Sequence, residues 1–521
     1  MTGAWRMTGA WLREHRALAG LVAAGALLRA GMMAAYYPAF GYFYDTRAYM
    51  DAASSGTPSP IWPFGYPAML KVLGTTGHIA SVSAVQHLMG LVMGVGIYAL
   101  CTRRGVRRSW SALAAAPVLL DARQIQLEHY VLSETLFSFL LLAGVALLMW
   151  SRRPPLWLMG LSGLVFALVT LTRTVGQPIA ALVVLYLIVR RVGWQRIALF
   201  TVSLVVPVVA YMVWYDRHYD AYALNSYTGR YLWQRTTTFV DCTRTDFTPQ
   251  ERQICPPEPL GHREVSDVYL WELDRDRIGA RYPGPEHDWL FRHFALKAIR
   301  EQPGDFAAAV ATDAWHLVQP GWPAPARIAC TTDLWTMPSG GRSGNQVSNC
   351  TATLMARGFQ PAGSGGAAPT VTPLNSALWA YGQTVVMPPS ALVLLALFAL
   401  AATVRRRRGG GRRLRDREAA DSVLLAVMSL SLLMLGVTLS VIDLRFLVPL
   451  LVTAPLAAVL AAHRLASRPT APDAAPAPTG SPEPALSAEE TAASTRRVHT
   501  AGVETSRRKA TGIPRSRTPR R

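Results

Sequence analysis

The chain alternates between long apolar runs and short polar connections. Ten runs predict membrane-spanning helices, each of which needs roughly 17–25 mostly apolar residues. They lie at 17–39, 79–101, 109–120, 132–150, 156–172, 177–190, 196–214, 385–404, 422–441 and 445–465. The third and sixth runs are short, so they must extend, tilt or enter only part way. The pattern predicts an α-helical polytopic membrane protein with about ten transmembrane helices.

Arginines mark one side of this predicted bundle. They crowd into alternate connections, at 103–108, 151–155, 190–196 and 405–417. The opposite short connections hold only Arg47, Arg123, Arg173 and Arg445. Because positively charged connections stay on the cytoplasmic side, we expect a multi-pass protein of the cell membrane with both termini cytoplasmic.

The spans divide the chain into regions. We expect a cytoplasmic N-terminus (1–16), a transmembrane core (17–214) with outer loops 40–78 and 121–131, an extracytoplasmic domain (215–384), further transmembrane helices (385–465) and a basic tail (466–521). The extracytoplasmic domain is predicted to be mixed but mainly helical, with amphipathic helices at 263–280, 286–301 and 304–318. The tail is rich in Pro, Ala, Ser and Thr, which predicts disorder.

Composition agrees with a membrane location. The 521 residues are 51% hydrophobic and only 16% charged, yet the formal net charge is +20. These values argue against an ordinary soluble enzyme, and they exclude the collagen-like, coiled-coil and disulfide-scaffold classes. The arginines already account for orientation, and no nucleic-acid recognition module is visible, so a nucleic-acid partner is not expected. The basic end of the tail could lie on anionic membrane lipids.

Four of the five cysteines fall in the predicted extracytoplasmic domain. They are Cys242, Cys255, Cys330 and Cys350. In an oxidising compartment four cysteines indicate two disulfides, and three connectivities are open. We favour Cys242–Cys255 and Cys330–Cys350 because each closes a short loop. A zinc site is the alternative, although no CxxC or paired histidine spacing accompanies these cysteines.

Acidic residues gather where the two outer loops meet the spans, a costly place for a carboxylate and therefore a functional hint. These acids are Asp45, Asp51, Asp121, Glu128 and Glu134, and Arg123, His129 and Arg173 lie at the same level. Several of these residues also have a structural interpretation that requires no functional site. The tyrosines around Asp45 could form an interfacial belt, Glu134 could complement a helix dipole, and Arg173 could snorkel. The combination favours a site.

Four motifs in these loops resemble the GT-C superfamily, the membrane glycosyltransferases that use polyprenyl-phosphate-linked sugars. Protein mannosyltransferases and aminoarabinose transferases are the nearer kin. The matching stretches run Tyr44-Asp45-Thr46-Arg47-Ala48-Tyr49, Pro63-Phe64-Gly65-Tyr66-Pro67, Glu128 to Phe137, and Asp443-Leu444-Arg445-Phe446-Leu447-Val448-Pro449, with a looser match at 171–176. The chain departs from many relatives in following Asp45 with Thr46 rather than a second acid.

The resemblance implies inverting transfer of a sugar from a polyprenyl-phosphate donor to an acceptor hydroxyl at the outer membrane face. Asp45 would be the general base. Arg173, Arg123 and Arg445 would bind the donor phosphate. Glu128, Glu134 or Asp121 would position the acceptor or hold a metal. Tyr44, Tyr49 and His129 would line the substrate site.

The sequence leaves the cofactor and the acceptor open. A divalent cation, Mg²⁺ or Mn²⁺, suits oxygen ligands, but some relatives need none. The acceptor could be a glycan, a lipid or a protein. The main alternative function is a lipid-linked-sugar flippase or secondary transporter, which would also carry charges at membrane depth. A non-catalytic anchoring protein is the third hypothesis.

Overall fold

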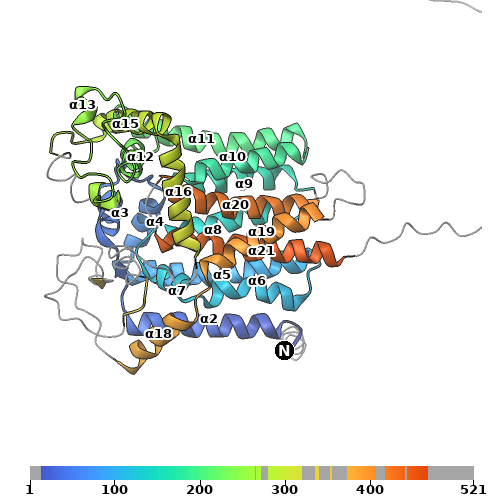
Figure 1. Ribbon diagram of the computed structural model, residues 1–521. Coiled ribbons are helices and arrows are strands. Elements are labelled where there is room, and N and C mark those ends of the chain that lie inside the picture. Colours follow the sequence, from blue (N-terminus) through green and yellow to red (C-terminus); the bar gives the residue numbers. More distant parts are fainter. Residues whose placement is uncertain are drawn as a thin grey trace, which may run out of the picture. The chain divides into compact units, whose positions relative to one another are not determined.

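The structure is a computed structural model that describes residues 13–151, 153–264, 266–270, 278, 280–319, 335–338, 353–354, 372–405, 417–439 and 443–467. Each predicted span coincides with a helix in these ranges. The helices are α2 (Arg16–Ala35), α5 (Ala80–Arg103), α6 (Arg108–Leu120), α8 (Glu134–Met149), α9 (Leu156–Thr172), α10 (Gly176–Val189), α11 (Trp194–Tyr219), α19 (Pro389–Arg405), α20 (Arg417–Leu439) and α21 (Val448–Ala466). Figure 1 shows them running alongside one another. The predicted helical membrane fold is confirmed.

Not all of these helices are long enough to cross a bilayer alone. Among the described residues, α2, α5, α11, α20 and the stretch Leu444–Ala466 have the length and apolar character of a full span. A sixth would be α18 (Pro373–Thr384) joined to α19 with a bend of 44°. Helices α8, α9 and α10 are apolar but shorter, and α6 has only 13 residues. The chain is therefore a multi-pass membrane protein whose spans differ in length.

Small residues let neighbouring helices approach closely. A Cβ on Gly144 of α8 would lie 2.7 Å from the ring of Phe166 in α9. A Cβ on Gly163 of α9 would lie 2.2 Å from the carbonyl oxygen of Phe200 in α11. Both glycines therefore lie at helix–helix contacts. Small residues are common at such contacts in membranes, where the hydrophobic effect does not drive helices together.

Short elements at one end of the bundle bring the two predicted loops together. They are α3 (Phe43–Ser55), α4 (Gly65–Gly74), α7 (Ala122–His129) and the strands β1 (Phe40–Gly41) and β2 (Thr353–Leu354), which pair antiparallel. Phe40 also forms a parallel bridge with Tyr130, and its carbonyl accepts from the Val131 amide at 2.9 Å. The start of α3 is thereby tied to the start of α8.

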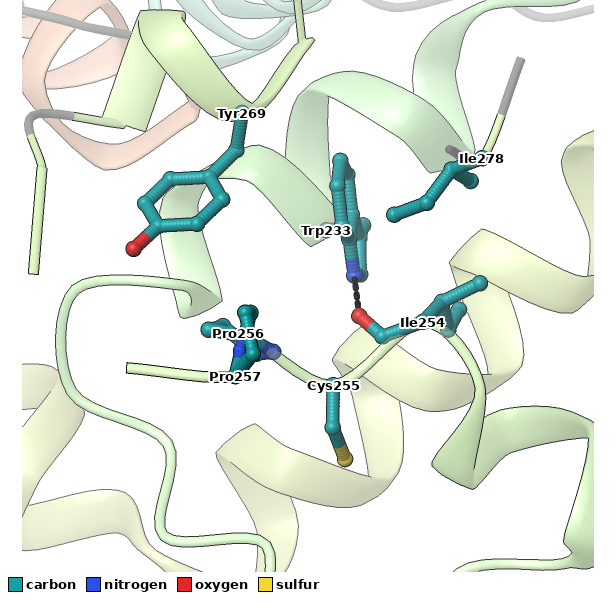
Figure 2. A pocket seen from close by; sticks show the side chains of 7 residues that line it. All are labelled: Trp233, Ile254, Cys255, Pro256, Pro257, Tyr269 and Ile278. Carbon is teal, nitrogen blue, oxygen red and sulfur yellow. Dashed lines mark hydrogen bonds between the residues drawn. The ribbon is translucent and has the colours of Figure 1, made fainter. Parts of the chain in front are cut away.

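The long connection between α11 and α19 has a small core of its own. Its helices are α12 (Thr228–Thr236), α13 (Pro249–Arg252), α14 (Ser266–Val268), η2 (Pro285–His287), α15 (Asp288–Glu301) and α16 (Pro303–Val318). Buried Trp233, Phe291 and Phe294 form its centre. A small apolar cavity beside Trp233 is closed by Pro256, Pro257 and Tyr269 (Figure 2). Helices α15 and α16 match two predicted ones, whereas much of 263–280 lies outside the described residues.

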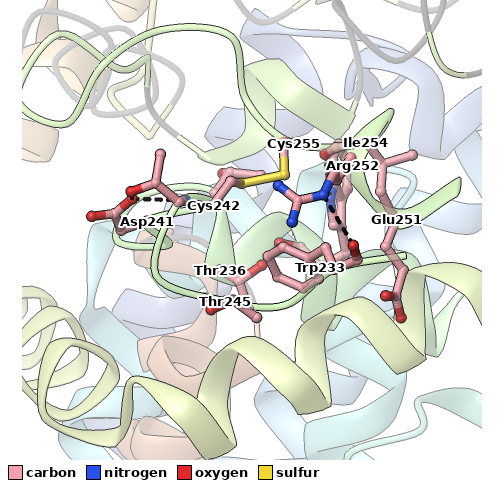
Figure 3. The surroundings of a disulfide bond; sticks show 12 residues. Trp233, Thr236, Asp241, Cys242, Thr245, Glu251, Arg252, Ile254 and Cys255 are labelled. Carbon is pink, nitrogen blue, oxygen red and sulfur yellow. Dashed lines mark hydrogen bonds between the residues drawn. A yellow bond between two sulfur atoms is a disulfide. The ribbon is translucent and has the colours of Figure 1, made fainter. Parts of the chain in front are cut away.

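A disulfide closes the edge of this small core. Cys242 is bonded to Cys255, the pairing that the sequence predicts (Figure 3). Cys330 and Cys350 lie outside the described residues, as does the predicted tail beyond Ser467. Cys101 is a buried free thiol near the end of α5.

Candidate active site

Asp45 and Arg445 form the centre of the candidate site. Asp45 lies in the first turn of α3, and Arg445 lies in η5 (Leu444–Leu447), the 3₁₀ turn that precedes α21. The Arg445 Nη1 donates to the Asp45 Oδ2 at 2.7 Å. The two side chains retain only 16% and 11% of their exposure. A buried ion pair therefore joins two residues that are 400 positions apart in the sequence, one after the first spanning helix and one before the last.

A second arginine and a second acid complete the charged cluster. Arg173 forms an ion pair with Glu134 and donates to the Ser133 hydroxyl at 3.0 Å. Glu134 also lies 3.6 Å from the Arg445 Nη1. The Arg445 guanidinium thus lies between the carboxylates of Asp45 and Glu134, and Arg173 pairs with Glu134, in a place from which most water is excluded.

Local sequence explains how each charge reaches the cluster. Arg173 is the residue at which α9 ends, in extended backbone that turns its side chain away from the helix. Asp443 accepts from the backbone amide of Arg445 at 3.0 Å and so begins η5. Thr46 donates to the carbonyl of Val131 at 3.1 Å, which fixes α3 beside the segment leading to Glu134. Thr46 therefore links the two outer loops.

An aromatic wall holds Arg445 from the other side. The Arg445 guanidinium carbon lies 4.8 Å from the ring centre of Tyr42. The Tyr42 hydroxyl donates to Asp443 at 2.9 Å, and the Trp335 indole donates to the same carboxylate at 2.8 Å. Trp335 stacks on Tyr42 with ring centres 5.5 Å apart. Asp443 is in turn 2.9 Å from the Arg445 Nε. Cation–π contact and charge together fix this arginine.

Sequence reasoning did not assign Tyr42, Asp443, Trp335 or Ser133 to the site. Two of these had a usable signal, because Tyr42 lies three residues before Asp45 and Asp443 two residues before Arg445. Trp335 had none, since the chain around it shows no periodicity. Tyr49 was predicted to line the site, and its hydroxyl contacts the Ser133 hydroxyl at 3.0 Å. Nothing is described of the Tyr44 side chain.

Glu128 and His129 lie in a separate buried network. Both Glu128 oxygens accept from Arg29 of α2, each at 2.7 Å. His87 of α5 contacts Glu128 at 3.0 Å and His129 at 3.1 Å. Burial lowers the pKa of His129 to about 3. For Glu128, burial would raise the pKa, but the charge of Arg29 holds it below its ordinary value. These two residues fasten α7 to α2 and α5, and the structure does not place them beside Asp45.

Asp121 and Arg123 also lie apart from the charged cluster. Asp121 caps α7 by accepting from the backbone amides of Arg123 at 2.9 Å and Gln124 at 3.2 Å, and it accepts from the Met387 amide at 2.7 Å. Within the described ranges, no polar contact joins the Arg123 guanidinium to Asp45 or Glu134. Of the three predicted phosphate-binding arginines, the structure brings together Arg173 and Arg445.

A divalent cation would need several oxygen ligands that converge on one point. In the part of the chain that the structure describes, no three His, Cys, Asp or Glu side chains converge as metal ligands would. Asp45 and Glu134 each face a guanidinium instead. In the described structure, these two carboxylates are therefore partnered by arginines.

Burial and charge act on Asp45 in opposite directions. Burial raises its pKa, the adjacent Glu134 carboxylate raises it further, and Arg445 and Arg173 oppose this. The net result is a pKa above the ordinary value of an aspartate. A carboxylate adjusted in this way is a better proton acceptor than an exposed one.

Comparison with known proteins gives weak structural similarity. No family model matches the sequence, and no curated protein matches it. The protein O-mannosyltransferase Pmt1-Pmt2 complex of S. cerevisiae, bound to its sugar donor, aligns with a TM-score of 0.32 and 13% identity over 49% of this chain and 37% of its own.

The oligosaccharyltransferase of Archaeoglobus fulgidus also aligns with this chain. Its complex with an inhibitory peptide and a dolichol-phosphate has a TM-score of 0.36 and 12% identity. Its complex with a tethered acceptor peptide has 0.39 and 11%. Both cover 87% of this chain, which spans about half of their length, 51% and 50%.

Proposed function

We propose that this chain transfers a sugar from a polyprenyl-phosphate-linked donor to an acceptor hydroxyl at the outer face of the cytoplasmic membrane, with inversion at the anomeric carbon. The observation that carries the proposal is the buried meeting of Asp45 with Arg445, beside the Arg173–Glu134 pair. One carboxylate for proton removal and two guanidiniums for a phosphate are what this reaction requires.

Asp45 acts as the general base in this mechanism. The acceptor oxygen attacks the anomeric carbon while the bond from that carbon to the phosphate oxygen breaks. The acceptor proton passes to Asp45, and the bonding electron pair leaves with the polyprenyl phosphate. The raised pKa of Asp45, which burial causes, makes it a stronger acceptor for this proton.

Arg445 and Arg173 stabilise the phosphate that leaves. Guanidinium groups bind phosphate through two parallel hydrogen bonds, and their charge is strongest where water is excluded. Without donor, Arg445 is held by Asp45 at 2.7 Å and by Asp443 at 2.9 Å. Donor phosphate therefore competes with Asp45 for Arg445, which frees the base as the donor binds.

The distribution of arginines supports an outer-face location. The cluster lies where α3, α8 and η5 begin, at the end of α8 opposite to the arginine-rich connections 103–108 and 151–155. Positive charge stays cytoplasmic. The predicted orientation, with both termini cytoplasmic, puts Asp45 on the outer side, where a donor that has been flipped outward presents its sugar.

A reconstituted transfer assay tests the proposal. Wild-type protein, Asp45→Asn and Asp51→Asn are compared with a panel of synthetic polyprenyl-phosphoryl sugars and acceptors, and release of polyprenyl phosphate is measured. We expect Asp45→Asn to lose roughly 10²- to 10⁴-fold in rate. Asp51 is the matched control, since it lies on the same helix with 55% of its side chain exposed, and its variant should turn over normally.

Two results would contradict the proposed function. Normal turnover by Asp45→Asn would remove Asp45 as the base. Movement of intact donor across the vesicle membrane, without release of polyprenyl phosphate by wild type, would favour the flippase instead.

A further inference from the structure

A second buried charged cluster lies at the far end of the bundle. Its centre is Asp421, near the start of α20, which is 1% exposed. Arg104, at the end of α5, and Arg417, at the start of α20, both pair with Asp421. The Tyr186 hydroxyl of α10 donates to the same carboxylate. Three helices, α5, α10 and α20, therefore meet at one point that the proposed transfer reaction does not use.

A third arginine in this cluster is incompletely satisfied. Arg190, where α10 ends, lies close enough to Arg417 and Tyr186 to interact electrostatically with both. Its Nε and Nη1 atoms are buried and have no hydrogen-bond partner among the described residues. A buried donor without an acceptor is costly, and such a group commonly indicates a missing ligand or water. Among the described residues, the Asp421 carboxylate pairs with two of these three arginines, Arg104 and Arg417.

Orientation alone does not explain this arrangement. Arginines that only orient a membrane protein need no burial, and Arg107, Arg153 and Arg191 at the same end are exposed. Arg104 and Arg417 keep only 11% and 14% of their exposure. Each also donates to the Met149 carbonyl at 2.9 Å, which caps α8. Capping uses these two arginines but does not involve Arg190.

Exposed tryptophans place the cluster at headgroup depth. Trp110, Trp150, Trp157 and Trp194 lie near the ends of α6, α8, α9 and α11, and are 40–76% exposed. Tryptophans of this kind mark the interface between hydrocarbon and water. The Arg103 guanidinium covers the Trp150 ring at 4.8 Å, next to the carbonyl group of Met149 that Arg104 contacts. The basic cluster is therefore level with lipid phosphates.

We propose that Arg104, Arg190 and Arg417 form a binding site for a phosphate group, supplied by the headgroup of an anionic phospholipid. Arg190 would give the phosphate the hydrogen bonds that it lacks within the protein, and Arg104 and Arg417 would share their charge between the ligand and Asp421. Basic pockets between spanning helices on the cytoplasmic side bind anionic headgroups in this way. The site would couple the packing of α5, α10 and α20 to the surrounding lipid.

Native mass spectrometry of the full chain in a neutral detergent tests this site. Dioleoyl-phosphatidylglycerol, dioleoyl-phosphatidylcholine and inorganic phosphate are titrated separately. We expect saturable binding of phosphatidylglycerol and little of phosphatidylcholine. The variant Arg190→Gln should bind phosphatidylglycerol about fivefold more weakly. Each lost arginine should weaken phosphatidylglycerol binding by a similar factor, and in the triple variant the three factors should multiply.

Matched controls separate the site from general surface charge. The control variants are Arg107→Gln alone and the triple Arg107→Gln, Arg153→Gln and Arg191→Gln, which lose equal charge from exposed positions. Both should bind like wild type. Arg190→Gln is decisive if the buried triple variant fails to fold, because no described hydrogen bond uses the Arg190 Nε or Nη1.

The outcomes separate the two phosphate sources. If inorganic phosphate displaced phosphatidylglycerol at the concentration at which it binds wild type alone, and the protein did not prefer the lipid, the site would be one for free phosphate. That result would overturn the lipid assignment. Equal phosphatidylglycerol binding by wild type and Arg190→Gln would overturn the site. An equal loss in the exposed control variants would do the same.

Discussion

Asp45 is a buried acid that shares its surroundings with a second acid. Glu134 lies on the other side of Arg445, whose Nη1 is 2.7 Å from Asp45 and 3.6 Å from Glu134. Two nearby carboxylates disfavour ionisation of each other, and burial disfavours it further. The arginines keep both carboxylates charged despite this cost. Loss of one partner from such a buried ion network would leave an uncompensated charge.

The influence of Glu134 on Asp45 predicts a shift in pH dependence. A general base works only when deprotonated, so activity is lost as the pH falls through the pKa of Asp45. Because the Glu134 charge raises that pKa, Glu134→Gln should move the acid limb of kcat/KM to lower pH. The pH at which the acid limb lies is the quantity to measure. The rate alone is less informative, because loss of Glu134 also affects its partner Arg173.

The same profile for Asp51→Asn provides the reference, because that exposed residue lies outside the cluster. An acid limb that stays in place, or moves to higher pH, would show that Glu134 does not act on the base.

Individual residues differed in how well the sequence predicted them. Asp45, Glu134, Arg173 and Arg445 lie in motifs beside apolar runs, and the structure brings all four together. Glu128 and Asp121 looked equivalent in sequence, but a carboxylate near a span can equally serve as a partner for Arg29 or as a helix cap. Which role a side chain takes depends on the direction in which a short helix points it, and that direction is set by packing.

The short helix α7 shows how an internal ion network fixes the segment that leads to the Asp45 cluster. Glu128 is held by Arg29 from α2 and by His87 and Gln124. The same helix then leads directly to Ser133 and Glu134. Any disturbance of this network should therefore affect both stability and the geometry around Arg173.

Gly90 of α5 provides a test of that network. A Cβ at this position would lie 1.9 Å from the Glu128 Oε1 and 2.7 Å from the Arg29 Nη2. Since both side chains are buried and paired, Gly90→Ala should destabilise the protein by about 1–3 kcal/mol through overpacking. Thermal unfolding in detergent measures this.

Gly96 is the matched control on the same helix. A Cβ there would make an ordinary contact of 3.7 Å with Leu142. Gly96→Ala should be neutral or slightly stabilising, because alanine favours a helix. Equal behaviour of the two variants would contradict the proposed crowding at Gly90.

At the scale of the whole molecule, two charged clusters lie at opposite ends of α8. Glu134 begins this helix in the Asp45 cluster, and Met149 ends it beside Arg104 and Arg417. The long apolar runs were sufficient to predict the positions of the ten helices described above, and they also indicated that the third and sixth are short. They could not predict the exact helix ends, because these depend on which polar groups find partners inside the bundle.

The disulfide gives a prediction for the connection between α11 and α19. Cys242 and Cys255 close a loop of 13 residues. Replacing both by serine should cost about 3 kcal/mol of local stability by the loop-entropy account. Protease sensitivity of the connecting segment, with and without reductant, measures this.

Wild type under reduction should match the double serine variant. Labelling of Cys242 and Cys255 in native, unreduced protein would contradict the bond. The buried thiol of Cys101 should resist labelling in both forms.

The short spans have a consequence for the membrane itself. Helices α8, α9 and α10 have 16, 17 and 14 residues, and their lengths of about 21–26 Å fall below the roughly 30 Å of a hydrocarbon core. This is a hydrophobic mismatch, and thinning of the adjacent lipid would keep the polar helix ends out of the hydrocarbon. A donor phosphate next to Arg173 would then sit deeper than in the undisturbed leaflet, and bilayers of shorter acyl chains should suit this protein better than thick ones.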